Sequence, residues 1–436
     1  MEIVARWRST WARVPCRVVS RSTAPSFHLL ARTGHPDFLD FPWDRPLAEW
    51  DDPRLVDYAR GVSRHVVRFV REDDRAYALK ETSLELAERE YRMLSDLYGD
   101  RLPVVKPVGV VTGRVDGAGE PLAAVLITRH LEFSLPYRTL FAGRGVPDIR
   151  RRLIDALAVL LVRLHLAGVY WGDCSLSNVL FRRDAGALAA YLVDAETAER
   201  HPTLTDGQRG HDLVIATENV AGELLDLCSA RRLPSDVDPL ETATELEKRY
   251  GELWAELTRT EVIRPGERHL IDARIRRLND LGFDVEEFEL VRTPEGDEIR
   301  VQPLVIDEGH HFRRLNALTG LRVQENQARR LLADIDGYRA WLSREAGTEV
   351  PEAVGAYRWL TEIFEPAVNR VPIGLRNRLP PAELFHEILE HRYYMGQELD
   401  RDVFTLEAVD DYVENVLRDR TEELAVLPDT DDDDLL

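Results

Sequence analysis

The first part of the chain alternates short apolar runs with polar turns. Residues 66–70 and 77–80 are two such runs, and the charged turn between them is typical of a β-hairpin. Two further strands are expected at 104–111 and 122–128, around a turn at 116–119 that contains two glycines. We therefore predict an antiparallel sheet in this region.

Longer periodic stretches predict helices. Residues 84–94 place their apolar side chains roughly on one side, and residues 151–166 are expected to form a long apolar helix. A short apolar strand at 179–181 and its return at 190–193 predict a second hairpin. The remainder of the chain is expected to be mainly helical, with one further hairpin. Its expected strands are 283–290 and 298–306, and its expected helices are 240–257, 270–278, 324–342, 352–364, 381–391 and 406–417.

Two segments flank the start of the sheet region. Segment 38–50 is rich in aromatic and proline residues, so we expect an ordered strap whose rings pack on the lobe that follows. The first thirty residues are basic and have no apolar core, so they do not form a secretory signal. Their arginines are Arg6, Arg8, Arg13, Arg17 and Arg21.

Composition narrows the class of protein. The chain has 436 residues, 44% of them hydrophobic, which is enough for two or three domains with ordinary cores. Its formal charge of -21 argues against general nucleic-acid affinity and favours a small or cationic partner, or simply solubility. No run approaches the roughly 18 apolar residues that a membrane helix needs. Cys16, Cys174 and Cys228 lack disulfide or metal-ligand spacing, so a reducing, cytoplasmic location is expected.

Candidate catalytic and metal-binding residues follow the long helix in the sequence. Asp173 and Asn178 lie five positions apart, and the returning strand of the hairpin ends on Asp194. Phosphoryl transfer from ATP uses one carboxylate to orient the acceptor hydroxyl, and an amide oxygen with a second carboxylate to hold magnesium. We therefore assign the catalytic role to Asp173. Asn178 and Asp194 are the expected ligands of Mg2+, which prefers hard oxygen donors.

These residues stand in a recognisable context. The sequence "LHLAGVYWGDCSLSNVLF", followed by "YLVDAE", resembles the catalytic loop and metal-binding strand of the protein-kinase-like superfamily. In particular it resembles the bacterial branch that includes lipopolysaccharide (Kdo) kinases. The resemblance implies an α+β, bilobal fold with an antiparallel-sheet N-lobe and a helical C-lobe. A mainly helical C-terminal domain with a β-hairpin is expected to follow.

The resemblance implies roles for two residues of the first lobe. Lys80 corresponds to the strand lysine that contacts the α- and β-phosphates of ATP, and Glu90 to the helix glutamate that pairs with it. The lysine-to-glutamate interval is shorter than in protein kinases, so Glu88 stays open as an alternative. By order along the chain, residues 128–131 occupy the hinge, where main-chain groups would bind adenine.

The loop over the phosphates departs from the family pattern. Kinases place a glycine-rich turn there, whereas this chain has only Gly61, which gives the backbone less freedom to approach a phosphate. Ser63 and Arg64 are the expected side-chain donors to the nucleotide. The same departure motivates the alternative function of a catalytically weak or inactive pseudokinase. Such a module would bind nucleotide or present its C-terminal domain to a protein partner.

Other departures concern the acceptor. Trp171-Gly172 stands where protein kinases carry His-Arg, and Ser175 replaces the lysine of serine/threonine kinases. Asp212 follows Asp194 by only eighteen positions, which leaves no room for a long peptide-docking segment. These features favour a small-molecule or glycan-derived hydroxyl acceptor. Asp212 is expected either to hydrogen-bond the catalytic loop or to act only as a helix N-terminal acid.

Several other polar residues have more than one possible role. Glu196 is interpreted either as a neighbour of the metal site or as an ordinary surface acid, and His165 as a core or capping histidine. His386 and His391 lie five positions apart, which rotates the second off a shared helix face and disfavours a zinc site. His310 and His311 are expected to pack or cap.

The whole layout resembles a mainly actinobacterial family that joins a lipopolysaccharide-kinase-like pair of lobes to a C-terminal domain of unknown function. The segments "FPWDRPLAEW" and "LFHEILEHRYYMGQELDRDV" carry this resemblance. It supplies no substrate. The expected organisation is a basic arm at 1–35, the N-lobe with its strap at 36–131, the C-lobe at 132–235, the C-terminal domain at 236–425 and an acidic tail at 426–436.

Overall fold

The structure is a computed structural model that describes most of the chain. The described residues are 27–58, 64–73, 75–142, 148–235, 237–259, 261–263, 269–270, 273–274, 278, 287–292, 299–304, 309–420 and 422–423. Most of the expected basic arm, the acidic tail and the turn between the last two expected strands lie outside these residues, as does most of the expected helix at 270–278.

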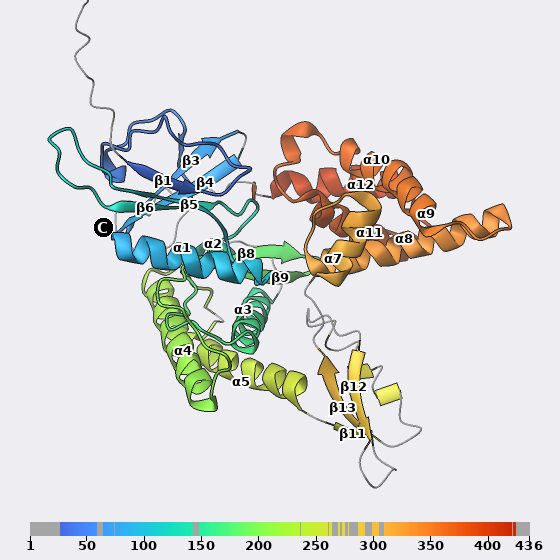
Figure 1. Cartoon of the computed structure of the whole chain (residues 1–436). Helices are drawn as coiled ribbons and strands as arrows, with labels where there is room; N and C mark the ends of the chain where they lie inside the picture. Colours follow the sequence, from blue (N-terminus) through green and yellow to red (C-terminus); the bar gives the residue numbers. More distant parts are fainter. Residues whose placement is uncertain are drawn as a thin grey trace, which may run out of the picture.

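A six-stranded antiparallel sheet forms the N-lobe (Figure 1). In space its strands follow the order β1-β5-β6-β4-β3-β2. Both hairpins expected here are confirmed. Residues 28–31, which the sequence placed in the basic arm, instead form the edge strand β1, because four residues are too few to show a strand period. The strands are β1 (His28–Ala31), β2 (Leu55–Val56), β3 (Val66–Glu72), β4 (Arg75–Thr82), β5 (Lys106–Thr112) and β6 (Ala124–Arg129).

The two faces of this sheet are covered differently. Helix α1 (Leu84–Gly99) packs against β5 and β6 on one face, and the Ser83 hydroxyl caps it by accepting the Leu86 N–H. The strap covers the other face with buried aromatic side chains, as predicted. The Arg114 guanidinium, also buried, donates to the Trp43 carbonyl and pairs with Glu81, which fixes the strap to the sheet.

The C-lobe is built around one apolar helix, α3 (Ile149–Leu166). Helix α5 packs against α3 and α4 and shares their core. The sequence had assigned residues from 236 onward to the C-terminal domain, so α5 moves to the C-lobe. Its buried face, which includes Tyr250 and Leu253, makes that packing possible. The other elements are α2 (Tyr137–Ala142), β7 (Val169–Tyr170), β8 (Val179–Asp184), β9 (Ala187–Leu192), β10 (Glu199–Arg200), α4 (Asp206–Ser229) and α5 (Pro239–Thr258).

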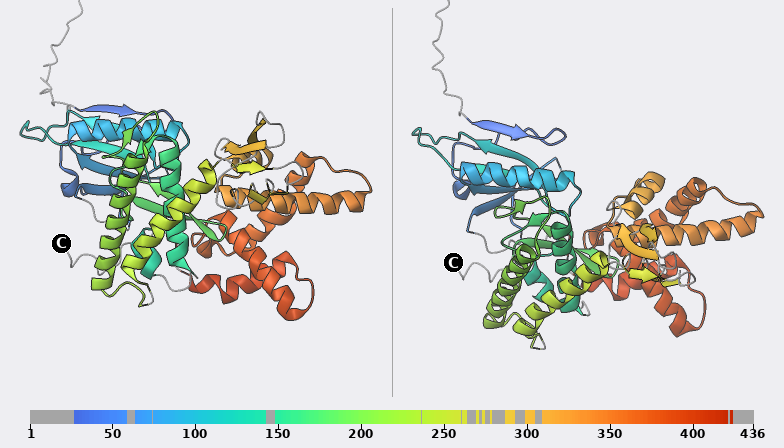
Figure 2. Two further views of the ribbon diagram at one scale, coloured as in Figure 1. Left: turned by 90° about the horizontal axis from the view of Figure 1, so that it is seen from below. Right: turned by 60° about the horizontal axis from the view of Figure 1, so that its bottom comes forward.

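The C-terminal part combines a small sheet with a helical unit that lies beside the lobes (Figures 1 and 2). The expected hairpin is confirmed as β12 with β13, and a third strand, β11, which the sequence missed, joins it. The helices share a second core around Trp359. These elements are β11 (Glu261–Ile263), β12 (Glu287–Arg292), β13 (Ile299–Leu304), α7 (His310–Thr319), α8 (Glu325–Ala346), α9 (Glu352–Trp359), the π-turn η2 (Leu360–Phe364), α10 (Glu365–Arg370), α11 (Pro381–Leu399) and α12 (Thr405–Asn415).

The arrangement is the expected α+β, bilobal fold with an antiparallel-sheet N-lobe, a helical C-lobe and a mainly helical C-terminal part. Within the described part of the chain, no helix has both the length and the apolar composition that crossing a membrane requires.

The strap supplies a test of how the N-lobe is stabilised. Trp43 is 1% exposed, and its indole N–H donates to the Phe38 carbonyl at 2.7 Å. We expect Trp43→Ala to lower the local free energy of unfolding by about 3–5 kcal/mol, because a large buried ring is removed. Hydrogen exchange of the β4 amides measures this local free energy of unfolding. It does not require the several domains of the chain to unfold together. Leu39→Ala, at a position 57% exposed in the same strap, is the matched control and should leave exchange unchanged.

Candidate active site

A single lysine connects three elements at the base of the N-lobe. The Lys80 ammonium on β4 lies 2.7 Å from the Asp194 carboxylate and 3.0 Å from that of Glu90 on α1. It also lies 3.4 Å from Glu196, two residues beyond Asp194. Glu88 pairs instead with Arg92 on the helix surface, so Glu90 is the residue that meets the lysine. The structure therefore brings together Lys80, Glu90 and Asp194, which are separated along the sequence.

The carboxylates of this cluster outnumber its lysine. Three carboxylates face one ammonium, and Glu90 is 1% exposed. Burial, with the nearby Asp194 carboxylate, raises the pKa of Glu90 to about 7. Burial alone would lower the pKa of Lys80, but Glu90 and Asp194 outweigh it and raise that pKa. The cluster thus keeps its lysine charged and holds more acid than that lysine neutralises.

The catalytic loop lies next to this cluster. The Asn178 amide donates to the Asp173 side chain at 3.1 Å and to its carbonyl at 3.0 Å. Asn219 on α4 donates to the other Asp173 carboxylate oxygen at 3.3 Å. Burial raises the pKa of Asp173, although the Asn178 hydrogen bond opposes the rise. Two amides therefore fix both oxygens of Asp173 while the carboxyl group stays only partly enclosed.

The fully buried Asp212 carboxylate supports the loop from below. It accepts the backbone N–H groups of Trp171 at 2.7 Å and Gly172 at 2.8 Å. Its other contact is His165, 3.1 Å away, whose second ring nitrogen meets the hydroxyl of Tyr250. The interpretation of Asp212 as only an N-terminal acid is wrong, because α4 begins earlier, at Asp206, and is capped by Thr205. The predicted hydrogen bonds to the loop are confirmed.

Sequence reasoning missed two supports on the same helix. Glu223 accepts the backbone N–H of Leu176 at 2.6 Å and that of Ser177 at 2.9 Å, and Asn219 contacts Asp173 as described. A signal was present, because Asp212, Asn219 and Glu223 recur at intervals of seven and four residues. That spacing places them on one face of a helix. One face of α4 therefore holds most of the catalytic loop.

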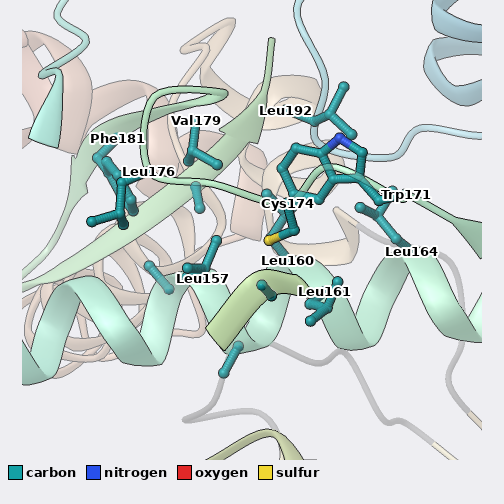
Figure 3. Close-up of a cluster of buried hydrophobic side chains, with 14 of the residues drawn as sticks. Leu157, Leu160, Leu161, Leu164, Trp171, Cys174, Leu176, Val179, Phe181 and Leu192 are labelled. Carbon is teal, nitrogen blue, oxygen red and sulfur yellow. The ribbon is translucent and has the colours of Figure 1, made fainter. Parts of the chain in front are cut away.

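Apolar side chains anchor the loop from its other side. Figure 3 shows Trp171, Cys174 and Leu176 among leucines of α3, with Leu192 of the hairpin nearby. The Trp171 indole N–H also donates to the Asp194 carbonyl at 3.0 Å. These three loop residues thus enter the core, whereas Asp173, which lies between Trp171 and Cys174 in the sequence, stays only partly buried.

The segment over the site closes it through Glu196. Arg64 lies 3.0 Å from one Glu196 oxygen, and the His65 ring nitrogen lies 2.9 Å from the other. Glu196 is 8% exposed, so it is not the ordinary surface acid that one interpretation proposed. Ser63, the other expected phosphate contact, and Gly61 lie outside the described residues.

The donor set fits a divalent cation. Glu90, Asp194 and Glu196 each offer a carboxylate oxygen, and these oxygens lie within 4.8 Å of one another. Asn178 donates from its amide nitrogen, so its oxygen is the atom left to act as a ligand. Hard oxygen donors of this kind suit Mg2+. Three histidines of the C-terminal part pair with acids, since His391 meets Asp411, His386 meets Glu390 and His311 meets Glu325.

The fold and the residues gathered in it define a protein-kinase-like arrangement. In agreement, residues 55–215 match the model of the lipopolysaccharide kinase (Kdo/WaaP) family, and residues 252–417 match a domain of unknown function, DUF4032. The two resemblances inferred from the sequence are therefore confirmed. No curated protein matches the chain. A solved structure described as WaaP in complex with acyl carrier protein is similar at 16% identity, over 52% of this chain and 88% of that one, with a TM-score of 0.32.

The expected hinge contains an unusual histidine. His130 donates its backbone N–H to Ala76, and its ring lies 4.8 Å from that of Tyr58 and 5.3 Å from that of Phe69, between centroids. Burial, with the nearby Arg71 charge, lowers the pKa of His130 from 6.5 to about 4. The ring is therefore neutral at physiological pH.

This shift predicts a pH dependence of stability. The pKa of His130 is lower in the folded state, so the unfolded chain binds the proton more tightly. The stability contributed by the neutral ring is full above pH 6.5 and is lost as the pH falls toward 4. We expect His130→Phe, which keeps a ring between Tyr58 and Phe69, to weaken the decline in melting temperature between pH 7 and pH 5. An unchanged decline would contradict the assignment.

Proposed function

We propose that the protein is an ATP- and Mg2+-dependent phosphotransferase that acts on the hydroxyl of a small-molecule or glycan-derived acceptor. The observation that carries this proposal is the contact of Lys80 with both Glu90 and Asp194, at 3.0 and 2.7 Å, beside Asp173 and Asn178. The match of residues 55–215 to the lipopolysaccharide kinase family supports it.

Each residue has a distinct role in this proposal. Lys80, held by Glu90, contacts the phosphates of ATP as a compact positive charge. Asp173 accepts or orients the proton of the acceptor hydroxyl, and its two amide partners keep it aimed at that position. Asn178 and Asp194 would hold Mg2+, which neutralises charge on the triphosphate. Arg64 leaves Glu196 and donates to a phosphate when nucleotide enters.

Several features favour a small acceptor over a protein. The segment from Asp194 to Asp212 contains only the two-residue strand β10 before α4 begins, which leaves little surface for docking a peptide. Trp171 and Gly172 replace the His-Arg pair that responds to phosphorylation of such a segment. The reaction takes place in the cytoplasm, consistent with the free thiols of Cys174 and Cys228.

The catalytic assignment is tested at Asp173. We expect Asp173→Asn to lower the rate of phosphate transfer, or of ATP hydrolysis, by a factor on the order of 10²–10⁴, because the proton acceptor is lost. The expected effect is on kcat, with little change in nucleotide affinity. Labelled ATP incubated with a metabolite extract provides the assay and also identifies the acceptor.

A binding assay separates the enzyme from the pseudokinase alternative. The wild-type protein should gain thermal stability with ATP only when Mg2+ is present, and Asp194→Ala should lose that gain. Asp173→Asn is the matched variant, because it should keep the stabilisation while losing turnover. Stabilisation by ATP without turnover in the wild type would favour a nucleotide-binding module, and no stabilisation at all would favour a scaffold.

A further inference from the structure

The tip of the β8–β9 hairpin lies against the C-terminal helices (Figure 1). Ala185 and Gly186 form its turn, and both have left-handed backbone angles, with φ of 51° and 83°. Such angles are strained for alanine. The Ala185 N–H donates at 2.8 Å to Glu383, a residue of α11 that is 3% exposed. The C-terminal part therefore binds the backbone of the turn directly.

Asp184, the last residue of β8, caps a helix of the C-terminal part. Its carboxylate is 4% exposed and accepts the backbone N–H of Gln327 at 2.9 Å and the side chain of Asn326 at 3.0 Å. Both residues lie in the first turn of α8, whose N-terminal N–H groups otherwise lack partners. A carboxylate at this position also meets the positive end of the helix dipole. The Asp184 carboxylate and the N–H groups of α8 thus supply hydrogen-bond partners to each other.

Further contacts join the C-terminal part to the hairpin. The Gln327 amide donates both to Glu383 at 2.8 Å and to the Arg183 carbonyl at 3.1 Å. Arg183 forms a two-pronged ion pair with Glu423, at 2.8 to 3.0 Å. The hydroxyl of Tyr191 on β9 donates to the side chain of Gln324, just before α8.

The other end of this hairpin carries the proposed metal ligands. Asn178 immediately precedes β8, Asp194 lies two positions after the end of β9, and the Val193 N–H donates to the Asn178 carbonyl at 3.0 Å. The strands pair continuously from this base to the tip. An isolated two-stranded hairpin is only marginally stable in water. In this chain β9 packs on α3, and backbone hydrogen bonds join Phe181 to Leu135 and Leu192 to Val105. The C-lobe therefore holds the body of the hairpin, and the C-terminal helices hold its tip.

We propose that the C-terminal domain is a working part of the phosphotransferase, because its contacts with the hairpin tip, together with those of the C-lobe core, set the relative position of Asn178 and Asp194. Asp184 is then a positioning residue that acts through the strands. The inference rests on the proposed function for its chemistry, but the mechanical coupling it describes is a property of the fold alone. It gives the domain of unknown function a defined task within this chain.

The test compares Asp184→Asn with Glu362→Gln. Asp184→Asn removes the charge and leaves at least one N–H of α8 unsatisfied, whereas Glu362 pairs with Arg358 on the surface of the same domain, away from the hairpin. We expect Asp184→Asn to speed hydrogen exchange at the Val193 amide. We also expect it to raise the Mg2+ concentration that gives half of the ATP-dependent thermal stabilisation by about 2- to 30-fold, a usual range for such couplings. Glu362→Gln should change neither quantity.

A milder variant guards against simple misfolding. Tyr191→Phe removes one hydroxyl contact and keeps the ring, so it should fold normally and shift both quantities in the same direction by less. A lower melting temperature with an unchanged Mg2+ midpoint would overturn the proposal and leave the contacts purely structural. If the wild type shows no Mg2+-dependent stabilisation, the proposed function fails. The exchange rate at Val193 then still decides whether the domain holds the base of the hairpin, and an unchanged rate overturns the coupling.

Discussion

The site depends on the ion pairs that the Lys80 ammonium forms. Taking a charge out of water is costly unless it is paired, and this lysine is paired with Glu90, Asp194 and Glu196. The three acids come from α1 and from the segment after β9, while the lysine comes from β4. The ion pairs therefore fix helix, sheet and hairpin at one point. The acids outnumber the lysine, and Arg64 pairs with one of them, Glu196.

Two sets of helices hold the residues around these ion pairs in place. Helix α4 supplies a row of polar side chains that bind the catalytic loop, with Asp212 at one end and Glu223 at the other. The C-terminal helices hold the far end of the hairpin through Asp184 and Glu383. The loop residues Asp173 and Asn178 lie between these supports. Buried polar networks of this kind are costly when incomplete, so removing one member is expected to loosen its neighbours.

Much of the fold and part of the candidate site could be predicted from the sequence. Period-two runs predicted the sheet hairpins, and the spacing of Asp173 and Asn178 in its apolar context predicted a loop in which the structure joins the two by a hydrogen bond. The strap was also predicted, because rings and prolines concentrated in one segment have to be buried. The edge strand β1 was missed, since four residues show no clear period, and α5 was assigned to the wrong unit, since periodicity finds a buried face but not its partner.

Other features depended on contacts between distant segments. Nothing local marks Asp184 or Glu383 as an acceptor, because the N–H groups of Gln327 and Ala185 reach them only once two domains meet. The contacts of Arg64 and His65 with Glu196 likewise join segments 132 and 131 residues apart in the sequence. By contrast, the sequence does contain a signal for the polar face of α4. Its residues Asp212, Asn219 and Glu223 lie at helical spacing, so a search for polar residues on one helix face would have found them.

The most direct test of the account labels the lysine itself. An acyl-phosphate derivative of ATP transfers its acyl group to a lysine amine beside the bound phosphates, and ATP departs as the leaving group. The chain has only three lysines, Lys80, Lys106 and Lys248, so peptide mapping by mass spectrometry is unambiguous. The account predicts labelling at Lys80 that excess ATP prevents. Equal labelling of Lys106 or Lys248, or labelling of Lys80 that ATP does not reduce, would contradict it.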